Sequence, residues 1–234
     1  MDAVVTDIEG TTGSIAFVRD VLFPYARARI GAFIQARGDE PEIRALLNDA
    51  ARAAGDPAMT DAMIASCLER WIDEDRKVTA LKTLQGLIWD EGYREGRLKG
   101  HVYADAAKAL RAWAKAGLAL YVYSSGSVEA QKLLFGHSVA GDLTPLFRGY
   151  FDTRIGPKKE AQSYRALAAE IGRPCAAILF LSDSAEELDA AADAGLKTIQ
   201  LVRPEDGTKP SPRHRVARSF DEIDPMCSEA REER

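Results

Sequence analysis

The 234-residue sequence predicts an α/β fold in which a doubly wound parallel sheet carries an inserted all-helical cap. Short apolar runs that end in polar turn clusters alternate with helical patterns, which is typical of repeated strand–helix–strand units. The runs are almost continuously apolar, as expected of strands covered on both faces. A long segment after the first run contains helical patterns only. We therefore predict a Rossmann-like core made of residues 1–16 and 98–234, and a helical cap domain made of residues 17–97.

The predicted strands share one pattern, an apolar run followed at once by small and polar turn residues. The first run, Val4–Asp7, ends in an acidic residue and precedes the turn-forming cluster Gly10–Gly13. Comparable runs lie at 118–123, 177–181 and 198–202, and Tyr150-Phe151 begins or ends a fifth strand. Ligands of such sheets bind beyond the carboxyl ends of the strands, so we expect the residues after these runs to form a site.

Helical patterns fill the intervals between the strands. The alanine-rich stretch 104–116 has an apolar face and is followed by Gly117, a common stop signal. Further core helices are expected at 129–135, 164–171 and 186–194. In the cap segment, apolar residues keep helical spacing from Val18 to Ile34, and Pro24 requires a break or a fresh helix start. More cap helices are expected at 43–54, 60–75 and 81–94, with a linker at 55–57.

Composition and charge exclude several classes of protein. With 46% hydrophobic and 29% charged residues, the chain is neither globally disordered nor fibrous. A formal net charge of -5 does not fit a dedicated nucleic-acid binder. No apolar stretch approaches the roughly 18 to 20 residues that span a bilayer, and the N-terminus lacks the pattern of a secretory signal. We therefore expect a cytoplasmic monomer that binds neither nucleic acid nor a membrane.

Cysteine and histidine usage indicates that the chemistry rests on carboxylates. The three cysteines, Cys67, Cys175 and Cys227, lie far apart and have neither zinc-binding nor redox spacing, which fits a reducing compartment. Only three histidines occur in the chain, so a histidine-rich metal site is not expected. The tail Cys227–Arg234 is polar, and we expect it to be frayed.

Acidic residues follow two of the predicted strands. Asp7 ends the first run, and Glu9 adds a second carboxylate two residues later. An isolated pair of this kind usually belongs to a solvated turn, but its place at a strand end before Gly-Thr-Thr favours a pocket. Asp183 follows the most apolar run of the chain. It suits Mg²⁺, which prefers oxygen ligands, and it suits equally well a cap of the following helix.

A serine cluster and a lysine pair indicate a phosphate site. Ser124–Ser127 precedes a predicted helix, and its hydroxyl groups together with free backbone N–H groups can hold a phosphate. At least one of these serines also fits a plain helix N-cap. Lys158 and Lys159 offer a balancing cation, and the sequence leaves open which of them does so. Glu186 and Glu187 are predicted to complement the dipole of their helix and support the loop, not to bind a metal.

The order of acid pair, serine, lysine and acid resembles the haloacid dehalogenase superfamily of phosphohydrolases. Within it, the stretch Asp7–Thr12, with Glu9 where most relatives carry Asp, resembles the acireductone synthases, the enolase-phosphatase family of methionine salvage. The similarity covers about residues 4–203. Its supporting stretches are 15–18, 22–25, 84–89, 92–93, 123–136, 180–183 and 186–191.

The resemblance implies a two-part reaction on 2,3-diketo-5-methylthiopentyl 1-phosphate, in which enolisation precedes hydrolysis to the acireductone and phosphate. It also implies one Mg²⁺ per subunit. The implied roles are Asp7 as nucleophile and metal ligand, Asp183 as second ligand, Glu9 as acid/base and as a metal ligand through its backbone carbonyl, and Ser124, Ser125 and Lys158 as substrate-binding residues.

Two alternative functions accompany this interpretation. One is another Mg²⁺-dependent small-molecule phosphatase of the same superfamily, and Glu9 and the region of Trp89 argue against it because they belong to the more specific match. The other is a non-catalytic phosphoprotein-binding module. The joint presence of four residues argues against it: Asp7, Glu9, Lys158 and Asp183. Mg²⁺-dependent release of phosphate from p-nitrophenyl phosphate would distinguish an enzyme from a binding module.

Overall fold

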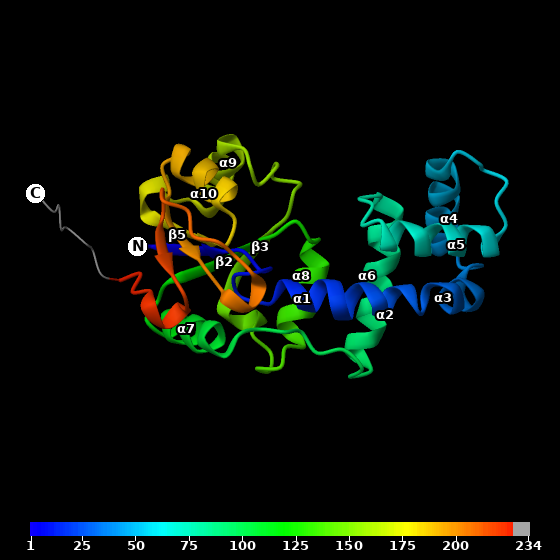
Figure 1. The fold of residues 1–234 in the computed structure, drawn as a ribbon, viewed down its shortest axis with the longest axis horizontal. Coiled ribbons are helices and arrows are strands. Elements are labelled where there is room, and N and C mark those ends of the chain that lie inside the picture. Colours follow the sequence, from blue (N-terminus) through cyan, green and yellow to red (C-terminus); the bar gives the residue numbers. More distant parts are fainter. Residues whose placement is uncertain (227–234) are drawn as a thin grey trace, which may run out of the picture. The chain divides into compact units, whose positions relative to one another are not determined.

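A computed structural model describes residues 1–226 of the chain (Figure 1), so the predicted fraying of Cys227–Arg234 lies outside the described residues. Contacts divide the chain into two compact units, which we call the core unit and the helical unit. The core unit comprises Met1–Ile15 and the residues from Gly100 onward, and the helical unit comprises Ala16–Lys99. The division falls one residue from the first predicted domain boundary and two residues from the second.

The core unit contains a six-stranded parallel sheet in the order β3-β2-β1-β4-β5-β6, which confirms the predicted fold class. Its strands are β1 (Ala3–Thr6), β2 (Ala119–Tyr123), β3 (Phe147–Phe151), β4 (Ile178–Ser182), β5 (Lys197–Leu201) and β6 (Arg215–Ala217). In register, Thr6 pairs with Val122 on one side and with Leu181 on the other. The residues that follow these three strands therefore lie beside one another at one edge of the sheet.

Helices cover both faces of this sheet (Figure 1). They are α7 (Ala104–Lys115), α8 (Val128–Gly136), α9 (Ala161–Ile171) and α10 (Ala185–Asp193). On one face, Ala3 and Val5 of β1 pack in one cluster with Tyr164 of α9 and Leu188 of α10. On the other face, Phe135 of α8 lies against Phe147 of β3, with ring centroids 4.7 Å apart. Strands buried on both sides explain why their sequences read as continuous apolar runs.

The helical unit has its own core, as the segment's helical pattern predicts. Its elements begin with α1 (Ile15–Phe17), whose first residue belongs to the core unit. The others are a π-helical turn (Val18–Leu22), α2 (Phe23–Arg27), α3 (Ile30–Arg37), α4 (Pro41–Ala54), α5 (Asp61–Asp73) and α6 (Thr79–Arg94). Leu47, Leu68 and Trp71 are completely buried there. Pro24 stands in the first turn of α2, directly after the π-helical turn, and Leu22 and Phe23 keep helical dihedral angles. The predicted break is therefore absent, and the helix type changes just before the proline instead.

Across residues 1–226, the structure contains no helix with the length and apolar character that a membrane span requires.

Candidate active site

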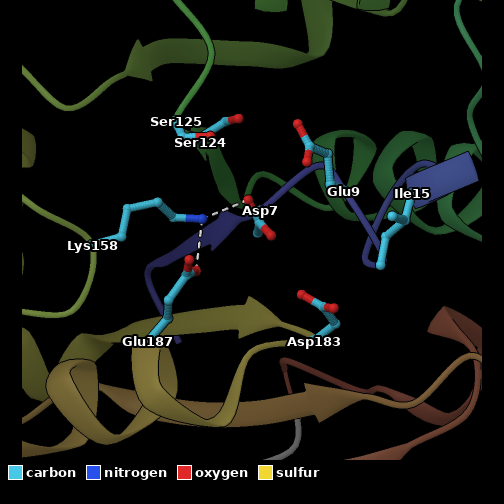
Figure 2. A pocket seen from close by; sticks show the side chains of 8 residues that line it. All are labelled: Asp7, Glu9, Ile15, Ser124, Ser125, Lys158, Asp183 and Glu187. Carbon is cyan, nitrogen blue, oxygen red and sulfur yellow. Dashed lines mark hydrogen bonds and ion pairs between the residues drawn. The ribbon is translucent and has the colours of Figure 1, made fainter. Parts of the chain in front are cut away.

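A pocket of about 170 Å³ lies in the core unit at the carboxyl edge of the sheet (Figure 2). Its lining includes all six site residues that the sequence predicts: Asp7, Glu9, Ser124, Ser125, Lys158 and Asp183. Two further residues, Ile15 and Glu187, complete the lining. The volume corresponds to about six waters at roughly 30 Å³ each, which leaves room for a phosphate group.

The loop after β1 turns back at once and brings both Asp7 and Glu9 into the pocket. The Asp7 backbone N–H donates to Leu181 at 2.9 Å, which extends the strand alignment one residue beyond β1. Gly10 then adopts a φ of +71°, and a Cβ atom on it would lie 2.6 Å from the Asp183 carboxylate. A glycine is therefore needed for the close approach of this loop to Asp183. The turn gives Asp7 and Glu9 the common pocket that their spacing predicts.

Lys158 lies between two carboxylates at the centre of the pocket. Its Nζ is 2.7 Å from Asp7 Oδ1 and 2.6 Å from Glu187 Oε2, and the residue is only 9% exposed. Lys159 is exposed and pairs with Glu186 outside this pocket. Of the two lysines that the sequence leaves open, the structure therefore places Lys158 beside Asp7.

Ile15 and Glu187 line the pocket although the sequence does not predict them there. The sequence predicts Glu187, like Glu186, as a partner of the helix dipole, but its carboxylate points toward Lys158 and also accepts a hydrogen bond of 3.0 Å from Ser182. The helical period could have indicated that Glu187 faces inward, because it lies four residues before the buried Ala191 on the same face of the helix. Glu186, one position away, faces solvent.

Asp183 lies in the pocket, and the N-cap position of α10 belongs to Ser184. The loop is held from β5, where Gln200 donates a hydrogen bond of 2.8 Å to the Asp183 carbonyl. Of the two positions that the sequence leaves open for Asp183, the structure therefore has the pocket, because Ser184 occupies the N-cap position of the helix.

The serine cluster divides between the pocket and the helix cap. Ser127 is the N-cap of α8, and its hydroxyl accepts a hydrogen bond of 3.2 Å from the Ala130 N–H. Ser124 and Ser125 line the pocket. The N-cap interpretation is therefore confirmed for Ser127, while phosphate binding by Ser124 and Ser125 stays a prediction.

The pocket carries more negative than positive charge. Burial and the charge of Asp7 raise the pKa of Asp183 to about 7, and the same two causes raise the pKa of Glu187 to about 7. Burial alone would lower the pKa of Lys158, but Asp7 and Glu187 outweigh it and keep that pKa above its ordinary value. One ammonium group thus shares the pocket with four carboxyl groups. A site of this composition favours a bound cation.

The carboxylate oxygens of Asp7 and Asp183 suit a hard cation that keeps part of its water shell. Within residues 1–226, no set of three or more His, Cys, Asp or Glu side chains is arranged to hold a metal ion on its own. An ion held by Asp7 and Asp183 would therefore take its remaining ligands from backbone oxygen and water.

Comparisons with known proteins identify the family of this chain. The haloacid dehalogenase-like hydrolase family matches residues 1–195. Enolase-phosphatase E1 of Methylococcus capsulatus is 57% identical over 95% of this chain and 97% of its own, and that of Pectobacterium carotovorum is 53% identical over 95% and 96%.

Solved structures show the same similarity. The crystal structure of the UTR4 protein of Saccharomyces cerevisiae has a TM-score of 0.81 and 34% identity, covering 95% of this chain and 99% of that one. CbbY of Rhodobacter sphaeroides, with a TM-score of 0.58 and 19% identity, shares the fold. The chain therefore belongs to the enolase-phosphatase E1 family of haloacid dehalogenase-like hydrolases.

Proposed function

We propose that the protein converts 2,3-diketo-5-methylthiopentyl 1-phosphate to 1,2-dihydroxy-3-keto-5-methylthiopentene and phosphate, a reaction of methionine salvage. The observation that carries this proposal is the Asp7 carboxylate, buried at the end of β1 and 2.7 Å from Lys158, in one pocket with Glu9. The enolase-phosphatase relatives supply the substrate class.

Asp7 is the nucleophile of the phosphoryl step. One of its carboxylate oxygens forms a bond to phosphorus while the bond from phosphorus to the ester oxygen breaks, and Glu9 donates a proton to that oxygen. Water then attacks the acyl-phosphate, its proton passes to Glu9, and free phosphate leaves. Lys158 neutralises charge on the phosphate oxygens, and Ser124 and Ser125 donate hydrogen bonds to them.

Asp7 and Asp183, with the backbone carbonyl of Glu9, would hold one Mg²⁺ per subunit. The excess of carboxyl groups over the single lysine supports this assignment. Burial, followed by the charges of Asp7 and Glu187, raises the pKa of Asp183, and a bound cation would favour its ionised form. When bound, the ion supplies charge neutralisation at the phosphate and at an enolate oxygen.

We further propose that residues 17–97 act as the cap domain of a core formed by residues 1–16 and 98–234, and that the protein works as a monomer in the cytoplasm. The division into a core unit and a helical unit supports the first of these assignments.

The proposal is tested by following enol absorbance and phosphate release together after the diketo-phosphate is mixed with the protein and Mg²⁺. We expect both signals from the wild type. Asp7→Asn keeps the shape of the side chain but lacks the nucleophile, so phosphate release should fall about 10³- to 10⁶-fold while the fold survives.

Asp193→Asn is the matched control, because Asp193 is an exposed residue of α10 outside this pocket. Phosphate release without any enol signal would favour the alternative of a simple phosphatase. Turnover near the wild-type rate in Asp7→Asn would show that water attacks directly, and it would overturn the assigned role of Asp7.

A further inference from the structure

The backbone beneath Lys158 is held by three hydroxyl groups from outside its own loop. Three successive carbonyl oxygens each accept one of them: Gly156 from the Tyr123 hydroxyl at 2.9 Å, Pro157 from Ser163 at 2.7 Å, and Lys158 from the Tyr164 hydroxyl at 2.7 Å. Tyr123 ends β2, and the other two donors lie in the first turn of α9. Two elements of the core thus fix one short loop.

The donors themselves have little freedom. Tyr123 and Tyr164 are completely buried, and their rings meet edge to face with centroids 5.6 Å apart. Phe180 of β4 packs against both rings. Burial raises the pKa of both phenols, that of Tyr123 to about 12, so the hydroxyl groups remain donors at neutral pH. A donor in a close-packed core holds its acceptor in place.

The loop also follows Ser163 closely. Gly156 has a φ of +141°, and a Cβ atom on it would come within 2.2 Å of the Ser163 hydroxyl oxygen. Glycine at this position therefore allows the hydroxyl to reach the Pro157 carbonyl. The fit leaves no room for the loop to move toward α9.

We propose that Tyr123, Ser163 and Tyr164 are positioning residues, which hold the backbone of Lys158 so that its Nζ stays between Asp7 and Glu187. The inference rests on the proposed function, in which Lys158 carries the charge of the phosphate. A lysine side chain is long and flexible, so the place of its ammonium depends on a fixed backbone. A displacement of about 1 Å at a reacting centre can lower a rate about 10²-fold.

A double-mutant cycle between Tyr164→Phe and Lys158→Ala separates positioning from general stability. Tyr164→Phe removes one hydroxyl and keeps the ring that packs in the core. We expect it to lower kcat/KM for the diketo-phosphate about 5- to 50-fold. In the Lys158→Ala background it should cause no further loss, because the group that it positions is absent.

The affinity for inorganic phosphate, measured for the same four proteins of the double-mutant cycle, is a second readout that requires no turnover. Tyr164→Phe should weaken phosphate binding in the wild-type background only. Tyr150→Phe is the matched control, since the buried hydroxyl of Tyr150 has no hydrogen-bond partner among residues 1–226. That variant should keep kcat/KM within about 2-fold of wild type.

Equal losses from Tyr164→Phe in both backgrounds would overturn the proposal, as would an unchanged kcat/KM in the folded Tyr164→Phe protein. If Tyr164→Phe does not fold, Ser163→Ala enters the same cycle with the same expectations. Failure of the proposed function has a different signature. The wild-type protein would then not convert the diketo-phosphate at all, whereas a wild-type rate in Lys158→Ala would show only that Lys158 does not carry the charge of the phosphate.

Discussion

Glu9 is half-buried in the loop after β1, and its carboxylate lines the pocket next to that of Asp7 (Figure 2). Its extra methylene, compared with the aspartate of most superfamily members, lets the carboxyl group reach further toward a substrate. Glu9→Gln cannot transfer a proton. We therefore expect phosphate release to slow about 10²- to 10⁴-fold, with a much smaller change in KM. Rapid mixing with the diketo-phosphate, read by enol absorbance and phosphate release, measures both steps.

Enol that accumulates in Glu9→Gln without phosphate release would support the role at the phosphoryl step. A folded variant that forms no enol would move Glu9 to the enolisation step instead. Glu170→Gln, at an exposed position of α9, serves as the control. Wild-type rates of both steps in Glu9→Gln would leave Glu9 without a chemical role.

Single residues of the site differ in how far the sequence could predict them. Asp7 and Asp183 could be predicted as site residues because each follows an apolar run, and the carboxyl ends of parallel strands lie at one edge of the sheet. Lys158 could not be separated from Lys159, since both stand in a loop without a periodic pattern. Lys158 is buried and Lys159 exposed because the fold brings Asp7 and Glu187, both distant in sequence, to the ammonium of Lys158. Such contacts have no local signal in the chain.

At the scale of elements, α8 is joined to the serine loop by Gln131. This residue is 2% exposed, and its side-chain amide donates hydrogen bonds of 2.8 Å to the Gly126 carbonyl and 2.9 Å to the Phe151 carbonyl. The amide thus connects the loop that follows β2 with the end of β3. Ser124 donates its own backbone N–H to the same Phe151 carbonyl at 3.1 Å.

Gln131→Met keeps the length of the side chain and removes both donors. We expect the free energy of unfolding to fall by about 1–3 kcal/mol, because the Gly126 carbonyl loses this donor and the Phe151 carbonyl keeps only the Ser124 N–H. Inorganic phosphate should also bind more weakly. Denaturant unfolding and inhibition by phosphate measure the two effects. Gln162→Met, at an exposed position of α9, should change neither. A Gln131→Met protein with unchanged stability and phosphate affinity would contradict this role.

A second element-scale feature joins the segment after β1 to the segment before α7. The Ser14 backbone N–H donates to His101 Nδ1 at 3.0 Å, so this contact requires that nitrogen to be unprotonated. Burial lowers the pKa of His101, assisted by Arg203 and opposed by Asp206 and Glu205. The unfolded chain therefore takes up a proton near pH 6.5 that the folded protein resists.

It follows that the free energy of unfolding should fall as the pH drops below about 6.5. In His101→Gln this contribution is absent, so the loss of stability between pH 7 and pH 5 should be smaller than in wild type. Denaturant unfolding at several pH values gives the comparison, and His137→Gln at an exposed position is the control. Equal pH dependence in wild type and His101→Gln would show that His101 does not contribute.

Elements were predictable where their pattern was long. The core helices α7, α8 and α10 begin within a residue of their predicted starts, because apolar spacing and flanking glycines mark them. The edge strand β6 was missed. Its three residues, Arg215–Ala217, form no apolar run, and only pairing with β5 makes them a strand. Edge strands owe their structure to a partner distant in sequence.

At the scale of the whole molecule, the doubly wound sheet was predictable because apolar strands and amphipathic helices alternate along the chain. The balance of charge in the pocket was not. It arises when loops from three strands meet, and Glu187 joins them from α10. That balance has a consequence for the stability of the entire protein.

The carboxyl groups of Asp183 and Glu187 have pKa values raised to about 7, so the folded protein holds protons that the unfolded chain has already released. The free energy of unfolding of the metal-free protein should therefore decrease as the pH rises from about 4 to about 7. Mg²⁺ competes with these protons. Its stabilising effect should accordingly grow over the same pH interval and be largest near pH 8.

Thermal unfolding with and without Mg²⁺ tests this expectation. An ion present at about 100 times its Kd adds about 2.7 kcal/mol, which corresponds to a rise in Tm of about 5–10 °C for a chain of this size. Asp183→Asn should abolish most of the rise, because it removes a carboxylate ligand, while Asp193→Asn should preserve it. A rise that is the same at pH 5 and pH 8, or that survives in Asp183→Asn, would place the ion elsewhere. Since the measurement reports binding without turnover, it tests the metal site independently of the reaction.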